Sequence, residues 1–194
     1  MRLYHSVGSR STRVLWLLEE LGAPFDTTVL TLEERRGAEH VTRHPLGRVP
    51  VVDTGSGLLF ESGAICLQLA DLHAQAGLIG PLGSHERGLA YQWAFYNATE
   101  IEPGVVEVYR FRETEPARAD AGRERFAAAA VAIERHLAGN EWMVGNAFSV
   151  ADVLVGDGMR LGAWMELLGD FPGIQAYVAR LQARPAFQRA TAIA

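Results

Sequence analysis

Residues 48–63 read RVPVVDTGSGLLFESG, and this stretch decides the fold of the first part of the chain. Two short apolar runs, 49–53 and 58–61, stand on either side of the sequence TGSG at 54–57. Glycines accept the positive φ that a tight turn between antiparallel strands requires. We therefore expect an antiparallel hairpin, followed at once by a helix over residues 62–75.

The sequence on both sides of this hairpin alternates between strand-like and helix-like runs. In order, the runs are RLYHS, TRVLWLLEEL, FDTTVLT, EERRGAEHVTRH, VPVVD, LLFE and SGAICLQLADLHAQ. Their pattern is β-α-β-α-β-β-α. The first two strands should be parallel, because a helix connects them.

A change in sequence character divides the chain near residue 77. Residues 77–85 are rich in Gly and Pro and show no periodicity, whereas the sequence after them is helical in pattern. The helical runs cover residues 86–112, 117–137, 150–168 and 174–183. We expect a fold of the class α/β plus all-α, with one domain over 1–76, a linker over 77–85 and an all-helical bundle over 86–194.

The clearest helix start is the sequence FSVADV at residues 148–153. Ser149 is a favoured N-cap, Asp152 lies at the third helical position, and Phe148 precedes the cap as in a hydrophobic staple. We interpret this signal as structural.

The composition excludes several classes of function. Of 194 residues, 48% are apolar, and 18 basic residues against 23 acidic ones give a net charge of −5. Every basic residue is Arg, so no lysine is present for a Schiff base, for pyridoxal phosphate attachment or for a P-loop. No basic stripe predicts nucleic-acid binding, and no apolar stretch approaches the roughly 20 residues of a membrane helix.

Cysteine and histidine usage sets further limits. Cys66 is the sole cysteine, which excludes an intramolecular disulfide and a dithiol mechanism. The chain starts without the apolar core of a signal peptide, so we expect a reducing, cytoplasmic location. His40 and His44 are four residues apart, but Pro45 draws His44 into an extended conformation, and we expect no metal site.

Three local features of residues 1–76 point together to a small anionic thiol ligand. The first is the turn GSRSTR at residues 8–13, which places the hydroxyls of Ser9 and Ser11 at the start of a helix. The amides and dipole of a helix N-terminus favour negative charge and stabilise a thiolate. The alternative is that Ser9 or Ser11 is only the N-cap of that helix.

The other two features lie at the hairpin. A cis Val49-Pro50 bond would turn the backbone of Val49 outward to pair with an extended peptide ligand, although Pro50 could also be an ordinary turn proline. At the strand-to-helix junction, Ser62 and the first helical amides can receive a carboxylate while Glu61 receives an ammonium. The alternatives here are a solvated Glu61 and a helix-capping Ser62.

Four motifs in this order resemble the glutathione S-transferase family: LYHSVGSRSTRVLWLLEELG, HPLGRVPVV, FESGAICLQLADL and FSVADVLVGDGM. The similarity covers nearly the whole chain. The resemblance implies a thioredoxin-like N-terminal domain, an all-helical C-terminal domain and a homodimer.

The resemblance also implies roles for individual residues. The catalytic hydroxyl of the family matches Ser9 best, with Ser11 as the second candidate, and Arg10 stands where cysteine-type members have their catalytic cysteine. Glu61 and Ser62 match the pair that holds the γ-glutamyl end of glutathione.

The remaining matches concern the middle of glutathione and the second substrate. Val49, held by Pro50, matches the residue whose main chain binds the cysteinyl part, and Arg48 could reach the glycyl carboxylate. By resemblance, the helix that carries Trp93 and Glu102 lines the second-substrate pocket or a dimer cleft. Spaced aromatic residues on a helix more often belong to a core than to a pocket, which is the alternative here.

We therefore expect a glutathione transferase in which glutathione is the co-substrate and its thiolate attacks a small, electrophilic, largely apolar molecule. One alternative is a glutathione-dependent disulfide reductase that uses two glutathione molecules in place of protein thiols. The other is a non-catalytic binding module with the same fold. We expect a homodimer as the assembly, with neither nucleic acid nor a membrane as partner.

Overall fold

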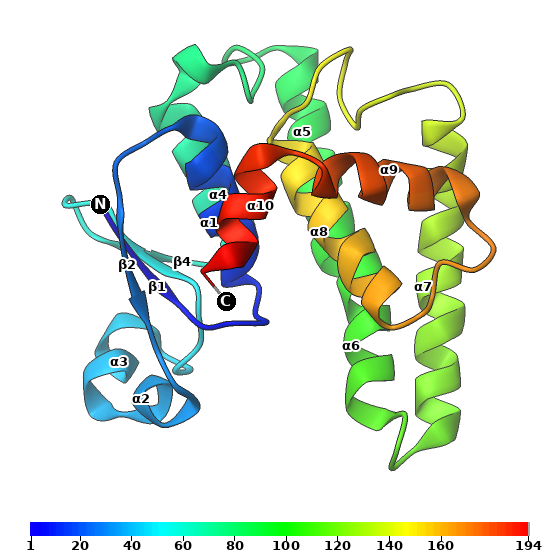
Figure 1. Ribbon diagram of the computed structural model, residues 1–194, viewed down its shortest axis with the longest axis horizontal. Coiled ribbons are helices and arrows are strands. Elements are labelled where there is room, and N and C mark those ends of the chain that lie inside the picture. The colour runs from blue at the N-terminus through cyan, green and yellow to red at the C-terminus, as the bar shows by residue number, and fades with distance from the viewer. Residues whose placement is uncertain (194) are drawn as a thin grey trace. The chain divides into compact units, whose positions relative to one another are not determined.

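The structure is a computed structural model that describes residues 1–193, and Figure 1 shows it as a ribbon. The chain forms two compact units. The first consists of Met1–Ala76 together with the segment that begins at Arg184, and the second consists of Gly77–Ala183. The expected helical domain ran to residue 194, whereas the segment from Arg184 onward belongs to the first unit.

The first unit combines a mixed sheet with helices. Its elements are β1 (Arg2–His5), α1 (Ser11–Leu21), β2 (Asp26–Val29), α2 (Leu32–Arg36), α3 (Ala38–Arg43), β3 (Val51–Asp53), β4 (Leu58–Phe60), α4 (Ser62–Leu72), the 3-10 turn η1 (Ala74–Ala76) and α10 (Pro185–Ala192). The strand order is β2-β1-β3-β4. Strand β1 is parallel to β2 and antiparallel to β3, and β3 is antiparallel to β4. The parallel first pair and the hairpin are thus confirmed.

Helix α10 packs beside α1, as the red and blue helices of Figure 1 show. The ring of Phe187 meets that of Trp16 edge to face, with centroids 5.1 Å apart. Arg184 forms a two-pronged ion pair with Glu20, with nitrogen–oxygen distances of 2.6 and 2.8 Å. Helix α10 is not among the expected helices, because nothing local in its eight residues indicates which surface they will cover.

The run EERRGAEHVTRH forms two helices instead of one. Thr31 and Glu34 make a capping box at the start of α2. Gly37 then ends α2 and begins α3, with φ −65° and ψ 150°. This extended conformation breaks the helical hydrogen-bond ladder.

The second unit is helical throughout its regular elements. They are α5 (His85–Tyr96), the π-helical turn η2 (Asn97–Ile101), α6 (Glu102–Phe111), α7 (Pro116–Leu137), α8 (Val150–Trp164) and α9 (Pro172–Gln182). The expected helix over 86–112 is therefore interrupted by η2. Pro103 has no amide hydrogen to donate to Thr99 O, and Arg125 Nη2 donates to that carbonyl instead at 2.8 Å.

The predicted start of α8 is confirmed. The Asp152 carboxylate accepts hydrogen bonds from the amide and hydroxyl of Ser149, both at 2.9 Å. It also accepts from the amide of Met143 and the hydroxyl of Tyr177. Burial raises the pKa of Asp152, and these four donors act in the opposite direction.

No helix within residues 1–193 combines the length and apolar character needed to cross a bilayer.

Candidate functional site

The strand register brings the predicted site residues to one edge of the sheet. Tyr4 lies opposite Val51, and Val51 lies opposite Phe60. Because β1 and β4 both run antiparallel to β3, they end where β3 begins. The turn after β1, the residues before β3 and the junction after β4 therefore share this edge, and all seven predicted residues lie there in the first unit.

The two serines of the first turn differ in exposure. Ser9 is partly exposed, whereas Ser11 is 0% exposed. The two hydroxyl oxygens are 2.6 Å apart, and the Ser9 hydroxyl also donates to Ser6 O at 2.6 Å. The Ser11 hydroxyl lies 2.8 Å from Nδ1 of His5, a side chain that is only 2% exposed. Of the two hydroxyls, that of Ser9 is the one within reach of a ligand.

Neither serine is the N-cap of α1. Arg10 occupies that position, and no side chain caps the helix. Likewise, Glu61 is the N-cap residue of α4 and Ser62 is the first helical residue, so the reading of Ser62 as a helix cap is wrong by one position. The capping alternatives therefore do not account for these three serines.

The peptide bond between Val49 and Pro50 is cis. Pro50 is buried, Val49 is partly exposed and the Arg48 side chain is exposed. Among residues 1–193, none forms a hydrogen bond with the main-chain N–H or C=O of Val49. The backbone here is available to a peptide-like ligand.

His40 holds the loop that leads to this bond. Its Nε2 lies 2.9 Å from Arg48 O, and because a carbonyl only accepts, Nε2 carries the proton. The side chain is almost fully buried on α3. From the sequence, His40 was weighed only as a metal ligand, whereas in the structure His40 positions the main chain next to Val49.

Glu61 has an unusual backbone conformation for a residue with a side chain, with φ 72° and ψ 110°. Its carboxylate is exposed and accepts no hydrogen bond within residues 1–193. Burial lowers the pKa of the neighbouring His44, and the negative charge of Glu61 opposes that shift. A non-glycine residue at positive φ is a costly conformation that often marks a binding site.

Ser62 is buried and connects the junction to α1. Nη1 of Arg13, a nearly fully buried guanidinium on α1, lies 3.5 Å from the Ser62 hydroxyl oxygen. This long contact places a positive charge beside the N-terminus of α4, which is the positive end of the helix dipole. An anionic group at this point would be attracted by both the Arg13 guanidinium and the N-terminus of α4.

His5 was not identified from the sequence, although a signal was present. In strand β1 the buried positions alternate, so that Leu3 and His5 point to the same interior. A polar side chain at an interior strand position, followed by three serines in six residues, indicates a buried hydrogen-bond network.

Two aromatic residues of α5, Trp93 and Tyr96, pack against other side chains of the second unit. The Trp93 ring packs edge to face on Tyr96 and His136, and Tyr96 donates its hydroxyl proton to Ala129 O at 3.1 Å. Glu102 is buried and accepts from the Asn97 amide at 2.8 Å. Thr99 and Glu100 are exposed. These contacts favour a core position, and not a second-substrate pocket, for Trp93 and Glu102.

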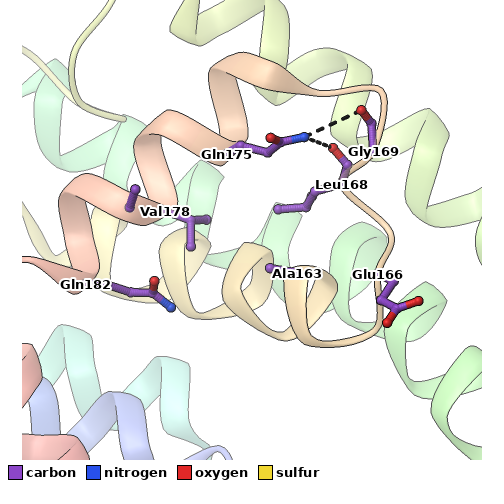
Figure 2. A pocket seen from close by; sticks show the side chains of 8 residues that line it. Ala163, Glu166, Leu168, Gly169, Gln175, Val178 and Gln182 are labelled. Atoms are coloured by element: carbon purple, nitrogen blue, oxygen red, sulfur yellow. Dashed lines mark hydrogen bonds between the residues drawn. The ribbon is translucent and has the colours of Figure 1, made fainter.

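A hollow of about 380 Å³ lies elsewhere in the second unit. Figure 2 shows it between α8, α9 and the loop that joins them, with the Gln175 amide donating to Leu168 O at 2.6 Å. Its lining has one ionisable side chain, Glu166, and includes no predicted site residue. The hollow has no nucleophile and no general base other than this exposed carboxylate, so we do not place the functional site there.

Cys66 supplies no accessible thiol, and the described residues form no metal site. The Cys66 thiol is 0% exposed, so it packs as a small apolar side chain, as predicted. Within residues 1–193 no group of three or more His, Cys, Asp or Glu side chains is arranged to hold a metal ion.

Comparisons with known proteins give matches in two parts of the chain. Residues 1–71 match the model of the glutathione S-transferase N-terminal domain, and residues 101–189 match that of the glutathione S-transferase C-terminal domain. The chain is similar to a sphingomonad glutathione S-transferase solved in complex with glutathione, with 28% identity, a TM-score of 0.91 and coverage of 100% of this chain and 98% of that one.

Two other similarities have different implications. A glutathione transferase family member from Pseudomonas fluorescens, solved with two glutathione molecules bound, is 26% identical with a TM-score of 0.88, covering 98% of this chain and 91% of that one. Elongation factor 1-gamma from Prunus avium is 27% identical over 159 residues, which are 78% of this chain but only 37% of the elongation factor. The two domain models together span most of the sequence, and the chain therefore belongs to the glutathione S-transferase family.

Proposed function

We propose that this chain is a glutathione transferase that binds glutathione at the sheet edge of the first unit and activates the glutathione thiol beside Ser9. The observation that carries the proposal is that three groups within reach of a ligand share this edge. They are the Ser9 hydroxyl, the main chain of Val49 and the carboxylate of Glu61. Each suits a different part of one tripeptide.

The fit follows from charge and hydrogen-bonding capacity. The γ-glutamyl ammonium pairs with Glu61, and the γ-glutamyl carboxylate meets Ser62 and the first amides of α4. The cysteinyl main chain pairs with Val49 in β fashion, and the exposed Arg48 reaches the glycyl carboxylate. The sulfur then lies at the start of α1, next to Ser9.

A modest free energy is enough to activate the thiol. Lowering its pKa by about two units requires about 2.7 kcal/mol of preferential thiolate stabilisation. One hydrogen bond to a charged group contributes about 1.5–3 kcal/mol, and a helix N-terminus adds about 0.3–1 kcal/mol. The thiolate then attacks an electrophilic carbon of a small, largely apolar acceptor, a carbon–sulfur bond forms and the leaving group departs with its electron pair.

The test combines binding, thiol titration and turnover. Calorimetry should detect glutathione binding, and an aromatic halide should be conjugated. Ser9→Ala should raise the pKa of the bound thiol and slow conjugation about tenfold or more, with glutathione affinity nearly unchanged. Ser56→Ala, in the exposed hairpin turn, is the matched control and should behave as wild type. Unchanged thiolate absorbance and rate in Ser9→Ala would contradict the role of Ser9.

Two other functions are supported by specific observations. The Pseudomonas fluorescens relative binds two glutathione molecules, which supports a disulfide reductase that needs no protein thiol. Disulfide reduction measured beside conjugation separates the two activities. Similarity to part of an elongation factor supports a domain without turnover, for which glutathione binding would be absent or unproductive in every assay. For the assembly we propose a homodimer, which sedimentation analysis would test.

A further inference from the structure

A buried chain of hydrogen bonds lies behind Ser9. It runs from His5 Nδ1 to the Ser11 hydroxyl over 2.8 Å, from Ser11 to the Ser9 hydroxyl over 2.6 Å, and from Ser9 to Ser6 O over 2.6 Å. His5 and Ser11 are both buried, and Ser9 is the member that reaches the surface. All four groups lie within residues 5–11 of the first unit.

Counting protons fixes the direction of this chain. Ser6 O is a carbonyl and can only accept, so the bond to it uses the single hydroxyl proton of Ser9. The contact between Ser9 and Ser11 must then use the hydroxyl proton of Ser11. The contact between Ser11 and His5 is left to use a proton on Nδ1 of His5. When all three bonds are made, His5 is the donor at the head of the chain.

Counting acceptor sites gives a second result. The Ser11 oxygen accepts from His5 and from the amide of Ser6 at 3.2 Å. The Ser9 oxygen accepts from the Ser11 hydroxyl and from the Ser11 amide at 3.3 Å. A hydroxyl oxygen has two acceptor sites, so both are occupied on each serine. Ser9 therefore has no site left to accept a proton from a thiol.

We propose that His5 is a positioning residue which, by donating from Nδ1 to Ser11, makes Ser9 solely a hydrogen-bond donor toward the sulfur of bound glutathione. The inference rests on the proposed function and deepens it. A thiolate accepts a hydrogen bond more strongly than a neutral carbonyl does, so the Ser9 proton turns from Ser6 O to the sulfur. A thiol that still carries its proton cannot donate to Ser9, and the site selects the deprotonated form.

The surroundings of His5 support a fixed donor. His5 lies in β1, the strand flanked by β2 and β3, and its carbonyl accepts from the amide of Leu30 at 2.7 Å. Burial lowers the pKa of His5, which keeps the ring neutral and leaves one proton to be placed. Without the Nδ1 donor, the Ser11 hydroxyl can turn to Ser6 O, 3.3 Å away, and an acceptor site on Ser9 becomes open to the thiol.

The test compares two substitutions that differ in one hydrogen-bond donor. His5→Phe keeps a ring but removes the donor, and His5→Asn restores an N–H near the position of Nδ1. We expect His5→Phe to raise the pKa of bound glutathione by about one unit, equal to tenfold less thiolate at a given pH below that pKa. His5→Asn should return the pKa to near the wild-type value. His85→Phe, an exposed histidine in the second unit, should have no effect.

The measurements separate this inference from the proposed function. Calorimetry gives glutathione affinity, ultraviolet absorbance of the thiolate gives the thiol pKa, and conjugation gives KM and kcat. At pH values below the pKa of the bound thiol, His5→Phe should lower kcat. The KM for glutathione should stay near the wild-type value. If wild type binds no glutathione, the proposed function fails. If wild type binds and His5→Phe leaves the thiol pKa unchanged, the role of His5 is wrong.

A second variant covers the case in which His5→Phe does not fold. Ser11→Ala removes the middle of the chain and keeps His5, and it should raise the thiol pKa in the same direction. A wild-type thiol pKa in folded Ser11→Ala would overturn the inference. Circular dichroism of each variant shows whether it is folded before titration.

Discussion

Gly47 shows how one residue without a side chain supports the site. It lies in the loop before the cis Val49-Pro50 bond, with φ +58°. A Cβ atom at this position would lie 2.6 Å from the carbonyl oxygen of Arg35. The close approach of two backbone segments, together with the left-handed conformation, makes glycine a requirement here.

We predict that Gly47→Ala destabilises the protein by about 2–4 kcal/mol, since it adds a backbone clash to the conformational cost. Gly22→Ala is the matched control, because Gly22 has φ +61° in the same unit and nothing within 4 Å of its Cβ position. That control should lose only about 1 kcal/mol. Denaturant unfolding measures both, and equal losses would contradict the clash.

At this scale the sequence indicates which residue types gather but not how each is exposed. It places Ser9 and Ser11 in one turn and leaves both as candidates for the thiol. Their difference arises because His5 occupies an interior position of β1 and draws Ser11 under the helix start. That contact joins side chains from a strand and a helix, and local periodicity does not report it.

Among the elements, α8 begins at a capping box built on a buried carboxylate. The buried Asp152 carboxylate accepts hydrogen bonds from the amide and hydroxyl of Ser149, the N-cap residue. It also accepts from the amide of Met143 and from the hydroxyl of Tyr177 on α9. Through these bonds it joins the start of α8, the preceding loop and α9. Burial raises the pKa of Tyr177, and the contact with Asp152 raises it further.

We predict that Asp152→Ala lowers the free energy of unfolding by about 3–5 kcal/mol, because it leaves several buried donors without an acceptor. Asp120→Ala is the control. Asp120 forms an ion pair with Arg123 at 2.6 Å, but its side chain is well exposed, so the loss should stay below about 1 kcal/mol. Thermal and denaturant unfolding of both variants test this. A small effect at Asp152 would show that solvent reaches the donors.

The sequence predicts helices well where caps are local and poorly where a helix is interrupted. Ser149 and Asp152 mark the start of α8 because the capping box lies within four residues. By contrast, η2 depends on Pro103 withholding an amide from Thr99 O and on Arg125, from α7, replacing it. The replacement is a tertiary contact, so the sequence shows the proline but not the π-helical turn.

For the whole molecule, a single cysteine can report on the stability of the first unit. The first unit holds the only cysteine, Cys66, which is buried in α4. A thiol reagent can reach it only when the structure opens. Its labelling rate therefore reports on the opening of the first unit, with no second thiol to complicate the signal.

We predict that Phe187→Ala accelerates labelling of Cys66 by more than tenfold, because removing a buried aromatic side chain from α10 costs about 3 kcal/mol. Phe187 is 7% exposed and packs on Trp16. Phe95→Ala is the control, since Phe95 is 69% exposed in the second unit. It should label at the wild-type rate. Equal rates in all three proteins would mean that α10 does not stabilise the first unit.

The composition and motif order were enough to predict the mixed sheet, the hairpin and the family. They were not enough to predict where α10 packs. Its partners on α1, Glu19 and Glu20, lie more than 160 residues away in the sequence. Pairing over such a separation is specified by surface complementarity, which a single sequence does not display.

The packing of α10 on α1 also bears on the order in which the protein matures on the ribosome. The first unit needs residues from Arg184 onward to cover Trp16, whereas the second unit is complete at Ala183. Domains usually fold in the order in which they are translated. Here the helical unit can finish while the sheet-containing unit still waits for α10, so a nascent chain would expose the Trp16 side of α1 until Pro185–Ala192 has been synthesised.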